Sequence, residues 1–151
     1  MILLSITKDI FFLLVAFMAG VAMATQGSMN SALSKAIGLS EATFVVHFSA
    51  TVVMLIILIL GISHGNWGNY SQVPWYYYLG GFIGVLITYG VVVSIPKLGV
   101  AVATTAIIVG QVLTACLVDH FGFFGLEKVP FTWLKFLGLV FLSIGAKLLL
   151  N

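Results

Sequence analysis

The chain of 151 residues has no arginine, and charged residues of any kind make up only 7% of it. Its six lysines and four acidic residues are dispersed and give a net charge of +2, whereas nucleic-acid-binding proteins gather many basic residues on one face. Hydrophobic residues make up 62% of the chain and the mean hydropathy is +1.23, which leaves too little polar surface for a soluble globule. The composition therefore predicts an integral membrane protein and argues against nucleic acid as a partner.

Motifs for catalysis and for redox chemistry are also missing. Cys116 is the only cysteine, so an internal disulfide is excluded and a buried structural thiol is expected. The sequence contains no HExxH zinc motif, no serine nucleophile elbow and no glycine-rich phosphate loop. We therefore expect no enzyme activity, no bound metal and no cofactor.

Apolar stretches of about 20 residues, the length that an α-helix needs to cross a bilayer, recur along the chain. They predict one all-α domain over residues 1–151 with five transmembrane helices at residues 10–37, 41–62, 74–95, 100–118 and 131–150. The breaks fall at Gly38, Pro74 and Pro96, residue types that begin or end helices. An A-x-A pattern at residues 22–24 is typical of a secretory cleavage site, but Asp9 before the first apolar stretch favours an uncleaved helix. Five crossings place the two termini on opposite sides of the membrane.

The lysines divide equally between the two sides of this arrangement. The side of the N-terminus has Lys8, Lys128 and Lys135, and the opposite side has Lys35, Lys97 and Lys147. An excess of Lys and Arg in cytoplasmic loops normally sets the orientation of a membrane protein, and here there is no excess. The chain is therefore expected to insert both ways, and inverted copies can pair as the inverted repeats of many secondary transporters do. We predict an antiparallel, dual-topology homodimer that transports by alternating access.

Uncharged polar residues lie near the middle of the first four expected helices and are the candidate substrate-binding groups. Gln26 and Asn30 are four residues apart and share one face of the first helix. Helical spacing also relates the groups on the other helices: Thr51 with His47, Thr88 with Gly81 and Gly84, and Thr104 with Gln111 and Thr114. Polar groups are costly in hydrocarbon unless they bind one another or face a cavity. Their convergence near mid-depth predicts a shared site for a small molecule.

A structural alternative stays open for each of these groups. A Gln or Asn can serve only as a hydrogen bond between helices, and a neutral His47 can bond a neighbouring hydroxyl. Asp119 and His120 can cap the interface where the fourth helix leaves the membrane. His47 is the one titratable group placed centrally, so His47, with Asp119 as a second candidate, is predicted to couple transport to protons. No carboxylate lies in the middle of a helix, which favours a small polar or amphipathic organic substrate over a hard ion.

Several spaced motifs extend along nearly the whole chain. They are Gly20 with Gln26 and Asn30, Pro74 with Trp75, Gly80 with Gly81, residues 96–99, Gly110 with Gln111, and residues 119–122. Together they resemble the YdcZ family, five-helix members of the drug/metabolite transporter superfamily. The resemblance implies a multi-pass transporter of the bacterial inner membrane that occurs as dual-topology single proteins, as oppositely oriented pairs or as fused duplicates.

The chain is also similar in outline to the small multidrug resistance transporters, which have four helices and a glutamate in the first. We expect a compact bundle like theirs with one helix more. Gln26 and Asn30 replace the acid here, which argues against proton-driven export of quaternary cations. The expected partners are the lipid bilayer, the substrate and a second copy or a paralogous subunit. A passive dual-topology channel and a non-transporting assembly factor remain alternative functions.

Overall fold

A computed structural model describes residues 2–62 and 64–149 of the protein, with side chains from Ile10 onward, so the side chains of Lys8 and Asp9 and the expected helix end at residue 150 lie outside the described part. The helices are α1 (Ile2–Ile37), α2 (Leu39–Ile59), α3 (Gly80–Leu98), α4 (Val100–Phe121) and α5 (Trp133–Leu149). Short 3₁₀ turns, η1 (Trp67–Gln72), η2 (Trp75–Leu79) and η3 (Phe123–Gly125), lie in the connections. The described residues contain no strand, as the all-α prediction requires.

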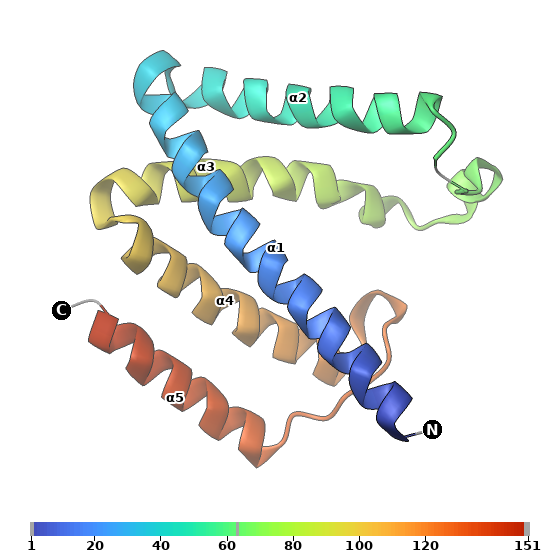
Figure 1. Ribbon diagram of the computed structural model, residues 1–151, viewed down its shortest axis with the longest axis vertical. Coiled ribbons are helices and arrows are strands. Elements are labelled where there is room, and N and C mark those ends of the chain that lie inside the picture. The colour runs from blue at the N-terminus through green and yellow to red at the C-terminus, as the bar shows by residue number, and fades with distance from the viewer. Residues whose placement is uncertain (1, 63, 150–151) are drawn as a thin grey trace.

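The helices form two layers (Figure 1). Helices α2, α3, α4 and α5 lie side by side in chain order, each packed against the next, and α1 crosses one face of this row diagonally (Figure 1). Helix α1 contacts α2, α3 and α4, whereas α5 packs mainly against α4. The diagonal course of α1 means that its successive turns face different neighbours.

Within the described residues, four helical segments are long and apolar enough to cross a membrane. They are Ile10–Ile37, Leu39–Ile59, Trp75–Leu98 and Val100–Phe121. Helix α5 has 17 described residues, which at about 1.5 Å of rise per residue span about 25 Å, less than the roughly 30 Å of a hydrocarbon core. The structure thus has the helices of a multi-pass membrane protein, and the fifth crossing stays a prediction.

Two sharp turns, each of a single glycine, close one end of the bundle. Gly38 (φ 100°, ψ 156°) separates α1 from α2, and Gly99 (φ 84°, ψ 159°) separates α3 from α4 in nearly the same conformation. A side chain is strained at these positive φ values, so both turns depend on glycine. Helix α3 continues through Pro96 to Leu98, past the expected end at residue 95, and Gly99 ends it instead. We call this end of the bundle the turn end.

The turn end is also where the protein is packed most tightly. The buried residues are Gly27, Asn30, Ser31, Ala42, Thr43, Val92, Ile95 and Ala103. All of them lie within three turns of Gly38 or Gly99 along their helices. Toward the opposite end, which carries the α2–α3 and α4–α5 loops, the described side chains are mostly exposed and the helices spread apart (Figure 1). The bundle is therefore closed at one end and looser at the other.

Positive charge marks the turn end as well. Lys35, Lys97 and Lys147 lie in the last turns of α1, α3 and α5, where the helix dipole favours a cation. These three helices end on the same side of the bundle (Figure 1). Lys128 and Lys135 lie on the opposite side, in the α4–α5 loop and the first turn of α5.

Candidate functional site

Several recesses open between the described helices, and three of them are compared with the candidate residues. The first, here called the α1–α2 recess, has a volume of about 850 Å³ and is lined by residues of α1 and α2. The second, called the central cleft, has a volume of about 460 Å³ and lies between α1, α3 and α4. The third, of about 800 Å³, is a groove between α4 and α5. The candidate polar residues of the sequence are distributed among these recesses and the helix contacts beside them.

The α1–α2 recess contains the two amides of the first helix. Gln26 is exposed at its wall, and Asn30 is only 9% exposed. Neither carboxamide has a hydrogen-bond partner among the described residues. Ser49 also lines the recess, but its hydroxyl already donates to the carbonyl of Val46 at 2.9 Å. The side chain of Asn30 is therefore largely buried, but its carboxamide atoms stay accessible, since no buried side-chain nitrogen or oxygen of the described residues lacks a partner.

The central cleft contains the amide of the fourth helix. Gln111 and Thr104 are seven residues apart on α4 and face the same cleft. Within the described chain neither side chain has a hydrogen-bond partner, whereas the adjacent Thr105 donates to the carbonyl of Ala101 at 2.7 Å. On the opposite wall, α1 presents Gly20 and Gly27. The cleft thus combines two free polar groups with walls of glycine and aliphatic or aromatic side chains.

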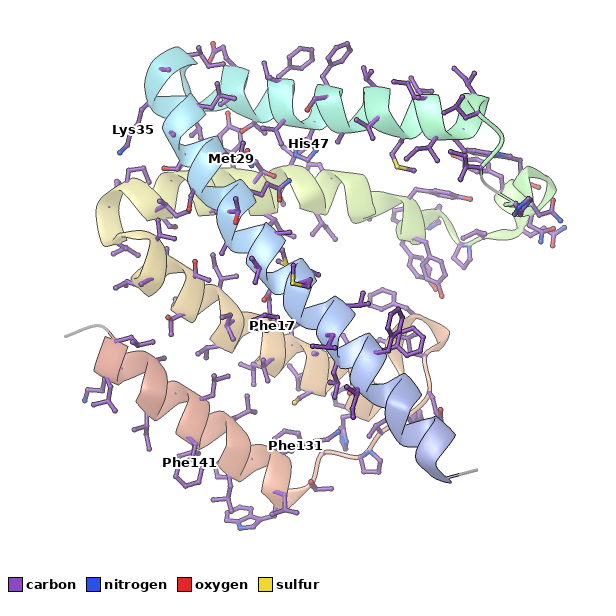
Figure 2. The ribbon with its side chains drawn as sticks, in the orientation of Figure 1. Phe17, Met29, Lys35, His47, Phe131 and Phe141 are labelled. Atoms are coloured by element: carbon purple, nitrogen blue, oxygen red, sulfur yellow. The ribbon has the colours of Figure 1, made fainter. Side chains whose placement is uncertain are left out.

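His47 lies between α2 and α3 rather than at the wall of either recess (Figure 2). Its Nε2 atom is 3.2 Å from Oγ1 of Thr88, and that hydroxyl donates to the carbonyl of Gly84 at 3.0 Å. Because the hydroxyl has a single hydrogen, Nε2 of His47 must be the donor to Thr88. The ring nitrogen Nδ1 is then left without a hydrogen in the neutral imidazole. The bond to Thr88 matches the structural interpretation of His47, in which a neutral imidazole bonds a neighbouring hydroxyl.

The remaining candidates lie apart from these groups. Thr51 is exposed and donates to the carbonyl of His47 at 2.9 Å, and Thr114 is exposed and lines none of the three recesses. At the end of α4, the backbone carbonyl of Asp119 accepts from the amide of Val129 at 2.9 Å. The ring atom Nδ1 of His120 accepts from the amide of Phe131 at 3.2 Å. These bonds connect the end of α4 to the segment that leads into α5.

A single protomer therefore does not bring the predicted polar residues to one point. Gln26 and Asn30 face one recess, Thr104 and Gln111 face another, and His47 with Thr88 joins α2 to α3. Gly27 was not among the residues expected from the sequence, and Gly20 was expected only as part of a motif. Their spacing of seven residues places both on one helix face, a signal for close packing or for an open wall.

No group of three or more His, Cys, Asp or Glu side chains that could hold a metal ion occurs in the described part of the chain. The side chains of His120 and Lys147 line the α4–α5 groove.

Comparison with known families agrees with this architecture. A family model described as "Putative inner membrane exporter, YdcZ" matches residues 11–148. No curated protein and no solved structure matches the chain. The match covers α1 to α5 almost completely and confirms the resemblance drawn from the sequence motifs. The chain belongs to the YdcZ family and is a multi-pass protein of the inner membrane.

Proposed function

We propose that the protein is a secondary transporter that carries a small polar or amphipathic organic molecule by alternating access, in a homodimer of two antiparallel copies. The observation that carries the proposal is the set of unpaired carboxamides of Gln26, Asn30 and Gln111, which face open recesses on two sides of α1. Unpaired amides inside a membrane are costly, and substrate pathways are where such groups occur. The match to an exporter family supports transport as the general activity.

The shape of the protomer supports alternating access. The buried residues gather at the turn end, and the recesses lie beside helices that spread toward the other end. A closed end and an open end are what one state of an alternating-access carrier requires. An inverted partner would present its closed end to the other side of the membrane, so the two copies would close opposite gates.

The distribution of lysines supports the antiparallel arrangement. Three lysines lie at the turn end: Lys35, Lys97 and Lys147. The sequence places the other three, Lys8, Lys128 and Lys135, on the opposite side, so neither side has an excess of positive charge. Orientation then has no strong electrostatic preference. Within such a dimer, His47 is the proposed coupling group, because its Nδ1 atom can take up a proton while Nε2 keeps its bond to Thr88.

The test is a comparison of exported molecules, which does not require the substrate to be known. Cells that express the protein, Gln26→Ala or Asn30→Ala would be compared by mass spectrometry of the small molecules in their medium. We expect compounds exported by the natural chain to disappear with both variants. Thr25→Val is the matched control, since Thr25 is exposed, lines none of the recesses described here and bonds only the carbonyl of Val21 at 2.9 Å.

Assembly must be measured in the same cells, because a variant that fails to dimerise would also fail to export. Chemical crosslinking of the two copies provides this readout. Export that is unchanged in both amide variants would overturn the site assignment. Flux without saturation in reconstituted vesicles would indicate a channel, and co-purification with a stoichiometric second protein but no flux would indicate an assembly factor.

A further inference from the structure

We infer that the substrate binds in the central cleft and is an uncharged, largely apolar organic molecule with one or two hydrogen-bonding groups. The inference rests on the proposed transport function and narrows its substrate class. It places the body of the substrate in the central cleft beside Gln111, while Gln26 and Asn30 line the α1–α2 recess on the other side of α1 as a further part of the proposed pathway. The cleft volume of about 460 Å³ falls within the roughly 300–1,000 Å³ that is typical of small-molecule sites.

The walls of the central cleft exclude a charged ligand. Of the described residues that line it, only Thr104 and Gln111 are polar, and none has a titratable side chain. A cation or an anion in this cleft would lose its hydration without gaining a partner of opposite charge, which is strongly unfavourable in a medium of low dielectric constant. A molecule with an uncharged, apolar body has no ionic hydration to lose, and it gains contact with Phe17, Ile87 and Ile108.

The two polar groups of the cleft are available to a ligand. Most hydroxyls on the described helices donate to a carbonyl three or four residues back in the same helix, as Thr105 does to Ala101. Thr104 does not, and the carboxamide of Gln111 is likewise unpaired. A carboxamide both donates and accepts, and a hydroxyl does the same. The two groups are about 10 Å apart along the helix axis, at about 1.5 Å per residue. They therefore suit a hydroxyl, carbonyl or amide at one or two places on an elongated molecule.

Three helices enclose the central cleft, whereas two enclose the α1–α2 recess. At one position of its α1 wall, Gly27 packs closely, and a Cβ atom there would lie 3.0 Å from Cγ1 of Val91. Further along the same wall a Cβ atom at Gly20 would meet no atom within 4 Å. The missing side chain of Gly20 therefore leaves open space in the cleft, and a larger residue at this position would extend into that space.

Photolabelling of the full chain in lipid nanodiscs tests the inference. The probes are a matched pair with the same body, uncharged 4-benzoylbenzyl alcohol and cationic 4-benzoylbenzyl-trimethylammonium. We expect the alcohol to label the cleft in a saturable way, for example at Met23, and the cation to label it at least tenfold less. Equal or stronger labelling of the cleft by the cation would overturn the inference.

Two variants and one control place the label in the cleft. Gly20→Leu should reduce labelling by the alcohol at least tenfold, and Gln111→Leu should weaken its half-saturation several-fold. Gly110→Leu is the control, because a Cβ atom at Gly110 also meets nothing within 4 Å but the residue does not line the cleft. Native mass spectrometry of each variant reports its oligomeric state. Unchanged labelling in Gly20→Leu, or loss of the dimer in this variant alone, would overturn the inference, the latter because a second copy would then cover the cleft.

The failure of this inference and the failure of the transport proposal give different results. If Gly20→Leu abolishes saturable labelling but the natural chain exports no compound, the binding site is supported and the transport function is contradicted. Export that persists in Gly20→Leu would leave transport intact and remove the central cleft as its site.

Discussion

His47 on α2 donates a hydrogen bond from Nε2 to Oγ1 of Thr88 on α3 at 3.2 Å. The hydroxyl of Thr88 in turn donates to the carbonyl of Gly84 at 3.0 Å, which fixes the direction of the first bond. A second contact between the same helices joins the hydroxyls of Ser40 and Tyr89. The α2–α3 contact is thus held by polar bonds in a region where most other side chains are apolar.

The first prediction concerns the strength of this bond. Thr88→Val removes the acceptor and leaves Nε2 of His47 unpaired, so we expect the free energy of unfolding to fall by about 0.5–2 kcal/mol. Unfolding in detergent can be followed by the reaction of Cys116, the only thiol, with a thiol-specific dye. In a double-mutant cycle, His47→Leu with Thr88→Val should cost less than the sum of the single changes. Additive effects would show that the two side chains are not coupled.

The second prediction concerns the close contact of α1 with α3. A Cβ atom at Gly27 would lie 3.0 Å from Cγ1 of Val91 and 3.3 Å from Cδ1 of Ile95. Gly27→Val should therefore overpack this contact and lower the free energy of unfolding by about 1–3 kcal/mol. Val91→Ala in the same chain should restore part of the loss. Gly20→Ala is the matched control on the same helix, and an equal effect of both glycine changes would argue against the contact.

The periodicity of the sequence predicted the helices well, because hydropathy and length decide where a chain can cross a bilayer. It predicted less well where helices end. Pro96 cannot donate to the carbonyl of Val92, yet α3 continues through it, because the amide of Gly99 still bonds the carbonyl of Ile95 and only one helical bond is lost. The conformation of the glycine turn, rather than the proline, ends this helix.

The sequence offered candidate residues for a site but not their arrangement in space. Helical spacing shows that Gln26 and Asn30 share a face and that Thr104 and Gln111 share another. It does not give the angle at which one helix crosses the next. Because α1 lies diagonally across the row, its amide face turns toward α2 while Gly20 and Gly27 face α3 and α4 (Figure 1). The crossing angle is a tertiary property, and it separates the amides that the sequence expected to converge.

The third prediction compares two glycines of α3 and its turn. Gly90→Ala lies within the helix, where an added Cβ atom meets nothing within 4 Å, and it should raise the free energy of unfolding by about 0.5–1 kcal/mol. Gly99→Ala meets nothing either, but its φ of 84° is unfavourable for alanine, so the same change should lower the free energy by about 1–2 kcal/mol. Thermal unfolding of both variants in one detergent measures the difference. Effects of the same sign would show that the turn does not require glycine.

The fourth prediction concerns the orientation of the protein in the membrane. The lysines divide three to three between the two sides in the sequence, so a single substitution creates an imbalance. Lys147→Ala leaves the N-terminal side richer in positive charge, and that side should then stay in the cytoplasm. Lys128→Ala leaves the other side richer and should keep the C-terminus in the cytoplasm.

Paired reporters fused to the C-terminus, one active only in the cytoplasm and one active only outside it, measure both orientations. The natural chain should give signal from both reporters, Lys147→Ala should shift the signal to the outer one, and Lys128→Ala should shift it to the cytoplasmic one. The two variants should shift the signal in opposite directions. This result distinguishes a change of orientation from a loss of expression, because loss of expression would lower both signals together. Signal from a single reporter in the natural chain, unmoved by either change, would contradict dual topology. An oppositely oriented paralogous subunit would then be the expected partner.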